Sequence, residues 1–161
     1  MAEHETWKMP DWWWRNERPA DDSVYFENMC RVIFQAGLNW QVIDNKWETT
    51  RKAFADFNIK EVACFTEADV QRLMNDPGIV RNKGKIKAII QNAQNFAVIE
   101  KRFGSFQKYL DSLDKSNNYA NAIKELVNTF KWLGPPFDEP FLVHRGRKNR
   151  ATVNKHLFPF C

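Results

Sequence analysis

Basic side chains gather in two short stretches of the chain, and such clusters can bind an anionic partner by charge attraction. Their members are Arg81, Lys83, Lys85 and Lys87 in the middle of the sequence, and Arg145, Arg147, Lys148, Arg150 and Lys155 near its end. Acidic residues concentrate instead near the N-terminus. The net charge of the whole chain is +4, so the distribution of charge is more informative than its sum. This separation of charge indicates a side that binds nucleic acid, and two solvated faces explain it about equally well.

The length and composition indicate a single domain. The chain has 161 residues, of which 43% are hydrophobic, enough to bury a core without cross-links. Its three cysteines are scattered without metal-type pairing, which predicts a reducing, cytoplasmic location rather than a disulfide framework. No apolar run approaches the roughly 18 residues that a membrane span requires. The N-terminus also lacks the order of basic and then aliphatic residues that is typical of a signal peptide.

Apolar residues recur at helical spacing along most of the chain, and no alternating pattern predicts a strand. Residues suited to begin or end helices punctuate this pattern. They are Asp22 or Ser23, Gly37, Asn39, Thr66 with Asp69, Gly104, and Asn117 or Asn118. The sequence therefore predicts an all-α fold.

Three blocks of sequence carry a resemblance to a known family. The run FQAGLNW at 34–40 is followed by FADF at 54–57 and by GIVRNKGKIKAI at 78–89. Together they resemble the 3-methyladenine DNA glycosylase I family of base-excision repair, a branch of the helix-hairpin-helix DNA glycosylases. The resemblance implies a helical, helix-hairpin-helix glycosylase-like domain.

The implied domain spans 1–161 and is expected to act as a monomer in the cytoplasm, associated with the nucleoid. Its parts are an N-terminal aromatic arm at 1–20, a best-matching core at 21–134 and a divergent C-terminal segment at 135–161. The arm contains Trp12, Trp13 and Trp14. Three consecutive side chains cannot all face one pocket, so we expect them mainly to pack the arm on the domain.

The implied activity is hydrolysis of the N-glycosidic bond that joins an alkylated purine, such as 3-methyladenine, to double-stranded DNA. An N3-alkylated adenine is positively charged and leaves readily, so the enzyme mainly has to flip the base and hold it. By resemblance, Trp40 stacks on the extruded base and Trp7 is a second residue of the base pocket. Leu38, at a turn between two helices, is expected to enter the duplex as a wedge.

Val32 stands where the family carries a glutamate that hydrogen-bonds the damaged base. It therefore offers the base-binding pocket only an apolar wall. A hydrogen-bonding pocket discriminates by about 10⁴, whereas an apolar one discriminates about a hundredfold at most. No catalytic residue is assigned, and the possible substitute carboxylates are Glu27, Asp44, Asp138 and Glu139. The alternative function is a noncatalytic DNA-binding or lesion-sensing protein derived from this family.

The resemblance also places a phosphate-binding hairpin at 129–135. Such a hairpin presents successive backbone N–H groups to one phosphate and so holds DNA without reading its sequence. Thr129 replaces the first glycine expected in it. The residues expected to contact the DNA backbone are Lys131, Trp132, Gly134, Arg81, Lys83 and Lys85.

The family joins its two ends through a zinc ion held by cysteine and histidine. His156 and Cys161 match the C-terminal ligand pair approximately, whereas only His4 could serve at the N-terminal end. A structural zinc site requires four ligands. We therefore expect no bound metal and no cofactor.

Overall fold

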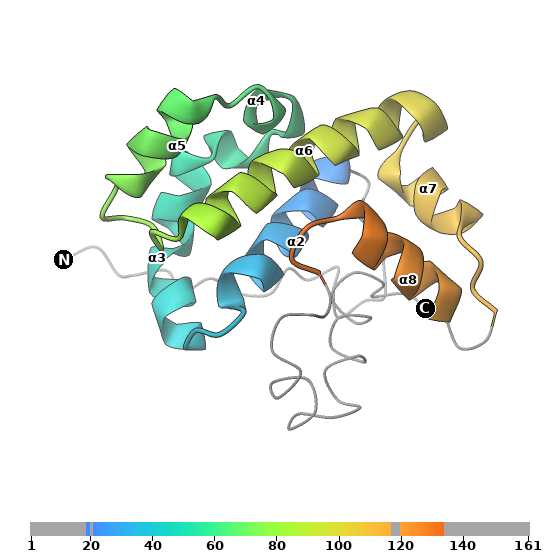
Figure 1. Ribbon diagram of the computed structural model, residues 1–161, viewed down its shortest axis with the longest axis horizontal. Coiled ribbons are helices and arrows are strands. Elements are labelled where there is room, and N and C mark those ends of the chain that lie inside the picture. Colours follow the sequence, from blue (N-terminus) through green and yellow to red (C-terminus); the bar gives the residue numbers. More distant parts are fainter. Residues whose placement is uncertain (1–18, 20, 117–119, 134–161) are drawn as a thin grey trace.

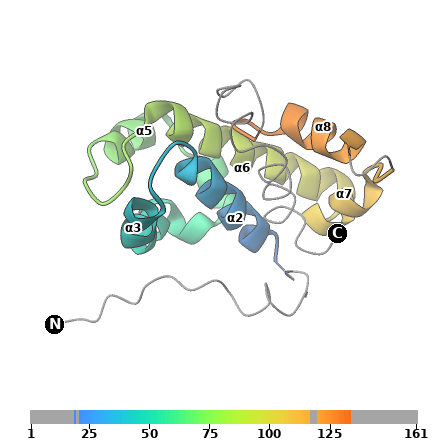
Figure 2. The same cartoon turned by 90° about the horizontal axis from the view of Figure 1, so that it is seen from below.

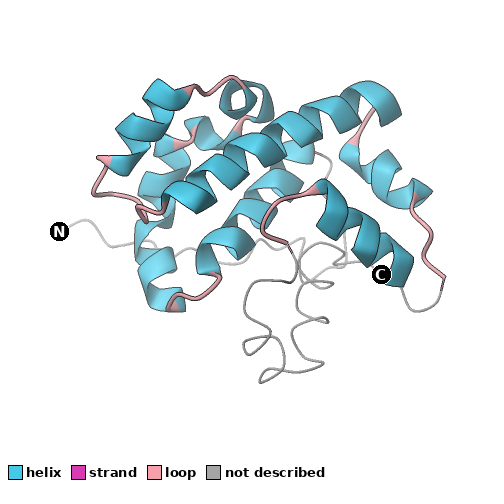
Figure 3. Cartoon of the chain, in the orientation of Figure 1, coloured by secondary structure: helices cyan, strands magenta, loops and turns pink. Residues whose placement is uncertain are grey.

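The computed structural model describes residues 19, 21–116 and 120–133, and these residues form helices joined by loops, with no strand among them (Figures 1 and 3). The predicted all-α fold is confirmed. The helices are α2 (Asp22–Gln35), α3 (Trp40–Ala53), the 3-10 turn η1 (Ala55–Phe57), α4 (Ile59–Ala63), α5 (Glu67–Met74), α6 (Lys83–Phe103), α7 (Phe106–Ser112) and α8 (Ala120–Thr129).

The long helix α6 is the centre of the fold. It contacts α2, α4, α5 and α7, and it runs between the group formed by α3 and α5 and the pair formed by α7 and α8 (Figures 1 and 2). The apolar stripe predicted for this helix is buried, since Ile86, Ile89, Ala93 and Phe96 are each fully inaccessible. Gly104 ends α6 with a positive φ of 89°, as expected of a glycine at this position.

Phe96 lies in the middle of an aromatic cluster. Its ring centroid is 5.4 Å from that of Phe26, 4.4 Å from that of Phe106 and 5.2 Å from that of Phe130. These partners belong to α2, to α7 and to the turn that follows α8. One side chain of α6 therefore joins three other segments through edge and tilted ring contacts, which stabilise a core beyond simple burial.

The turn η1 has a left-handed backbone at three consecutive residues that are not glycine, with φ values of 52°, 52° and 55°. Each such residue costs on the order of 1 kcal/mol and persists only where packing holds it. Phe57 supplies that packing, because its buried ring stacks on Trp47 at 5.3 Å and on Phe54 at 5.7 Å. The strain is therefore offset by the aromatic core beneath η1.

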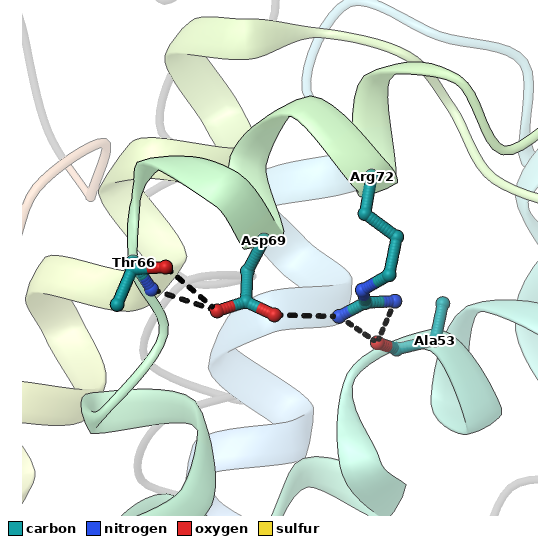
Figure 4. A network of polar contacts seen from close by, with 4 residues as sticks. All are labelled: Ala53, Thr66, Asp69 and Arg72. Carbon is teal, nitrogen blue, oxygen red and sulfur yellow. Dashed lines mark hydrogen bonds and ion pairs between the residues drawn. The ribbon is translucent and has the colours of Figure 1, made fainter.

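A capping box begins α5, as the sequence predicted (Figure 4). The backbone N–H of Thr66 donates to Asp69 Oδ2 at 2.8 Å. Arg72 donates to the other oxygen of Asp69 at 3.4 Å and to the carbonyl oxygen of Ala53 at 3.3 Å. This network satisfies donors at the start of α5 and also ties α5 to the end of α3.

The start of α2 differs from the prediction by one residue. Its cap is Asp21 rather than Asp22 or Ser23, because the Asp21 carboxylate accepts the N–H of Ser23 at 2.9 Å. The short helices α4 and α7 were not predicted, since five and seven residues are too few to show helical periodicity. Their caps, Asn58 and Ser105, were the available signal.

Candidate nucleic-acid interface

The loop between α2 and α3, residues 36–39, is held by its own backbone. The N–H of Ala36 donates to the carbonyl of Val32 at 3.2 Å, and the N–H of Leu38 donates to the carbonyl of Gln35 at 3.1 Å. Gly37 has a φ of 76°, a backbone conformation that residues with a side chain rarely adopt. Asn39 then caps α3, as predicted. We refer to this segment as the α2–α3 loop.

Three exposed apolar side chains lie on or next to this loop. Leu38 is 39% exposed, Trp40 is 53% exposed and Val42 is 42% exposed. Among the described residues, only Val98 is a further exposed large apolar side chain. A tryptophan and a leucine held out by a fixed backbone form a surface that can stack on a base and enter a gap. Val42 was not singled out by the sequence and adds to this surface.

Val32 lies in the last turn of α2 and is half-buried, and it carries an apolar side chain where the family resemblance expects a carboxylate. Two of the possible substitute carboxylates are held by other groups. Glu27 accepts the indole N–H of Trp47 at 3.0 Å and pairs with Arg51 at 3.2 Å. These contacts make Glu27 part of the α2–α3 packing.

Asp44 forms an ion pair with Arg31, whose side chain is only 7% exposed. The guanidinium carbon of Arg31 lies 5.0 Å from the centre of the Trp47 ring. Burial lowers the pKa of Arg31 to about 10, and the neighbouring Asp44 opposes that shift. Asp44 is therefore committed to a partly buried ion pair one helical turn beyond Trp40. The remaining substitutes, Asp138 and Glu139, lie outside the described residues.

The turn that follows α8, residues 130–133, is fastened to α6 by two asparagines. Fully buried Asn92 accepts the N–H of Lys131 at 2.7 Å and donates to the carbonyl of the same residue at 3.0 Å. Asn95 donates to the carbonyl of Thr129 at 2.8 Å. We refer to this segment as the α8 turn. Its fixed backbone carries the exposed Lys131, one of the predicted phosphate contacts.

This role of the two asparagines was not predicted from the sequence. The available signal was Asn92 itself, a polar residue within the buried stripe of α6 that contains Ile89 and Ala93. Buried polar groups of this kind are normally satisfied by a specific partner. Here the partner is a backbone segment far away in sequence.

The predicted phosphate contacts from the middle of the chain are in three different environments. Arg81 is exposed just before α6. Lys83 is exposed but lies 3.5 Å from Glu67, which also pairs with Lys87 at 3.2 Å. Lys85 is only 3% exposed, so its side chain does not form part of the surface on which a phosphate would lie. Its burial does not fit a direct contact with the DNA backbone.

Lys85 instead binds the end of α2. Its Nζ donates to the carbonyl oxygens of Phe34 at 3.0 Å and of Ala36 at 2.6 Å. The same nitrogen lies 5.6 Å from the centre of the Trp132 ring, within the range of a cation–π contact. Burial lowers the pKa of Lys85 to about 8. This lysine thus contacts both the α2–α3 loop and the α8 turn.

Several predicted site residues lie outside the part of the chain that the structure describes. They are Trp7, Gly134, the arm residues Trp12, Trp13 and Trp14, and the zinc candidates His4, His156 and Cys161. Within the described residues, no cluster of three or more histidine, cysteine or carboxylate side chains could hold a metal ion. None of the helices in the same part of the chain is both long and apolar enough to span a membrane.

Comparisons with known proteins agree with the helical fold and with the family resemblance of the sequence. The family model described as methyladenine glycosylase matches residues 4–131. The chain is 35% identical to DNA-3-methyladenine glycosylase 1 of Escherichia coli, in an alignment that covers 88% of this chain and 83% of the relative. It is 31% identical to DNA-3-methyladenine glycosylase of Haemophilus influenzae over 66% of this chain and 57% of that protein.

Solved structures agree as well. 3-Methyladenine DNA glycosylase I from Staphylococcus aureus, studied for its recognition of 3-methyladenine, superposes with a TM-score of 0.64 at 31% identity, covering 74% of this chain and 73% of that one. A variant of 3-methyladenine DNA glycosylase I in complex with 3-methyladenine gives a TM-score of 0.65 at 31% identity over 74% of both chains. The fold and these relatives therefore assign the protein to the class of helical DNA glycosylases. The chain belongs to the methyladenine glycosylase family.

Proposed function

We propose that this protein is a DNA glycosylase of base-excision repair that flips alkylated purines such as 3-methyladenine out of double-stranded DNA and releases them by hydrolysis. The observation that carries the proposal is the exposed pair formed by Leu38, on the α2–α3 loop, and Trp40, the first residue of α3, in a chain whose relatives are DNA-3-methyladenine glycosylases. An exposed tryptophan beside an exposed leucine serves no core and suits a flipped base and the gap that it leaves.

The first step is extrusion of the base. Flipping costs a few kcal/mol, and it is least costly for a damaged base, whose stacking and pairing are already weakened. Leu38 would fill the space vacated in the duplex, and Trp40 would stack on the extruded purine, a contact of about 1–3 kcal/mol. The fixed backbone of the α2–α3 loop holds both side chains out before DNA binds, so little ordering entropy opposes the step.

Backbone contacts would hold the duplex while the base is extruded. The α8 turn presents Lys131, and Arg81 precedes α6 as a second exposed cation. Both contacts are independent of sequence, as required of an enzyme that searches for damage.

The chemistry fits a labile substrate. A cationic N3-alkyladenine is a good leaving group without protonation, so holding it away from the duplex accelerates hydrolysis by a water molecule. A neutral purine requires a proton donor. Val32 provides none, and Glu27 and Asp44 are engaged in contacts between α2 and α3. The proposed substrates are therefore cationic alkylpurines rather than neutral lesions such as hypoxanthine.

The test is release of radiolabelled bases from methylated DNA, resolved by chromatography. Wild-type protein is expected to release 3-methyladenine and no hypoxanthine from an inosine-containing duplex. Trp40→Ala should reduce release to background, whereas Val98→Ala, which truncates an exposed apolar residue in the second half of α6, should leave it unchanged. Background release by the wild type, together with lesion-independent DNA binding, would favour the alternative, a noncatalytic DNA-binding or lesion-sensing protein.

We further propose that the chain acts as one domain over residues 1–161 and as a monomer on the DNA of the cytoplasmic nucleoid. A monomer is consistent with the separation of charge along the chain, which needs no second copy to form a DNA-binding side. Light scattering after size-exclusion chromatography, with and without a short duplex, measures the stoichiometry. A dimer on DNA would overturn this part of the proposal.

A further inference from the structure

We propose that Lys85 is a positioning residue that couples the two DNA-binding segments, the α2–α3 loop and the α8 turn, and so sets where Leu38 and Trp40 lie relative to the bound backbone. The inference rests on the proposed function, because it concerns how the same interface works. It assigns to Lys85 a role different from the phosphate contact that the sequence suggested.

The hydrogen bonds of Lys85 place it at the base of the α2–α3 loop. Its two acceptors are the carbonyls of Phe34, in the last turn of α2, and of Ala36, the residue before Gly37. The 2.6 Å bond to Ala36 is short, as expected of a charge-assisted contact. Lys85 therefore holds the start of the loop that carries Leu38 and leads to Trp40.

Electrostatics explain why a buried lysine is suited to this place. The carbonyls at the end of a helix carry partial negative charge, and a helix commonly offsets it with a basic residue of its own. α2 has no basic residue in its last turn. Lys85 supplies the missing charge from a different helix.

The position is unfavourable for α6 itself. Lys85 lies in the first turn of α6, where Asn82 caps its N–H at 3.1 Å and where a positive charge opposes the helix dipole. Burial adds a further penalty, which is the cause of the lowered pKa of this lysine. A residue whose charge is unfavourable both for the helix dipole and for burial is expected to make a specific contact with another segment.

The second contact reaches the α8 turn. The ring of Trp132 lies over the Lys85 ammonium and also against Gly84, where an added Cβ would come within 3.4 Å of that ring. Trp132 itself adopts a left-handed φ of 65°, a strained conformation that surrounding contacts must maintain. Through Lys85 and Gly84, the start of α6 therefore helps to hold the α8 turn as well as the α2–α3 loop.

The arrangement makes α6 a common support for both DNA-binding segments. Asn92, two turns further along the helix, holds the backbone of Lys131. A shift of either segment would stretch the Lys85 contacts. The distance between the α2–α3 loop and the α8 turn is therefore fixed before DNA binds. This matters because a misplacement of about 1 Å at a reacting centre can cost about a hundredfold in rate.

The test uses Lys85→Met, which keeps the apolar stem of the side chain and removes the donors and the charge. The control is Lys101→Met, an exposed lysine in the last turn of the same helix. Besides the Kd for an undamaged duplex, two quantities are measured for each full-length variant. One is the fluorescence of 2-aminopurine placed opposite an abasic analogue, which rises when a side chain enters the gap. The other is the single-turnover rate of 3-methyladenine release at saturating enzyme.

Lys85→Met is expected to abolish most of the fluorescence rise and to lower the release rate by about tenfold or more. Its Kd for an undamaged duplex should remain within about threefold of the wild-type value, because the phosphate contacts of Lys131 and Arg81 remain. Lys101→Met should change none of the three quantities. This split between binding and insertion is not expected of a residue that only stabilises the fold.

Circular dichroism shows whether Lys85→Met folds. If it does not, Trp132→Leu carries the test, since it removes the cation–π contact at the other end and keeps an apolar side chain. When both variants fold, the variant with both substitutions should release 3-methyladenine no more slowly than the slower single variant. Each substitution breaks the same connection between the two segments, so their effects should not add. A folded Lys85→Met with wild-type insertion and release would overturn the inference. A wild type that neither inserts nor releases would overturn the proposed function instead.

Discussion

Asn92 binds both backbone groups of Lys131, accepting its N–H at 2.7 Å and donating to its carbonyl at 3.0 Å. The two residues lie on separate segments, and the asparagine is fully buried. The position of the α8 turn thus depends on one carboxamide of α6. A backbone segment held in this way can present Lys131 to a phosphate without first having to become ordered.

The first prediction follows from that pair. Asn92→Leu keeps the branching and the number of heavy atoms of the side chain but leaves the N–H and the carbonyl of Lys131 without their partner, which should lower the free energy of unfolding by about 2 kcal/mol. Chemical denaturation measures this change. Asn95→Leu, which loses one bond to Thr129, should cost about half as much, and Gln91→Leu on the exposed side should cost little. Equal effects of all three substitutions would contradict the assignment.

The second prediction concerns Val32. Val32→Glu should raise the preference for 3-methyladenine over unmodified adenine by about tenfold or more, because a carboxylate can hydrogen-bond the purine. The substitution should also lower the free energy of unfolding by about 1–2 kcal/mol, since a half-buried charge loses hydration near the negative end of α2. Competitive base release and denaturation measure the two effects. Val32→Gln is the neutral control, and equal preference in both variants would show that charge is not needed.

The third prediction concerns the lysines bound to Glu67. Lys83 and Lys87 both pair with this carboxylate, and the hydrogen bond from Lys87 is the main cause of its lowered pKa. Glu67→Gln should free both lysines and tighten duplex binding several-fold at low salt, with a steeper decline as salt rises. Lys131→Glu should have the opposite effect. Fluorescence anisotropy over a salt series measures both effects. If the salt dependence of DNA binding did not change, these lysines would not be part of the DNA interface.

Much of the fold could be predicted from local signals. The glycines Gly37 and Gly104, the cap Asn39 and the capping box at Thr66 act through neighbouring residues, and they occur where the sequence predicted them. The apolar stripe of α6 was equally visible, because a long helix repeats its pattern over several turns. The cap of α2 was displaced to Asp21 by one residue, since several consecutive polar residues could serve there.

The environment of the charged residues could not be predicted in this way. Lys85 belongs to a run of basic residues and suggests a surface contact with phosphate, yet its acceptors are the carbonyls of Phe34 and Ala36, about fifty positions earlier. Asp44 likewise suggests a solvated helix face until Arg31 is brought beside it by the packing of α2 on α3. Both outcomes depend on contacts between distant segments, which spacing along the chain does not contain.

The fourth prediction concerns metal content. Because only His4 could serve as an N-terminal ligand beside His156 and Cys161, purified protein should contain well under one zinc per chain and should keep its helical content in a chelator. Elemental analysis and circular dichroism measure the two quantities. Stoichiometric zinc whose removal unfolds the protein would show that these three residues form a site with a further ligand.

The last prediction follows from the lowered pKa of Lys85. The pKa is 10.5 for an ordinary lysine and about 8 for this one, so between these pH values the unfolded chain binds more protons than the folded chain. The contribution of Lys85 to the free energy of unfolding should therefore rise as the pH increases from 8 to 10.5, because the folded protein no longer has to bury a charged ammonium group. Insertion of Leu38 into the gap in the duplex should decline over the same interval, since the neutral amine no longer offsets the charge at the end of α2. Denaturation and 2-aminopurine fluorescence of the wild type, each compared with Lys85→Met, isolate this group from other titrations. A difference between the two proteins that does not vary with pH would contradict the prediction.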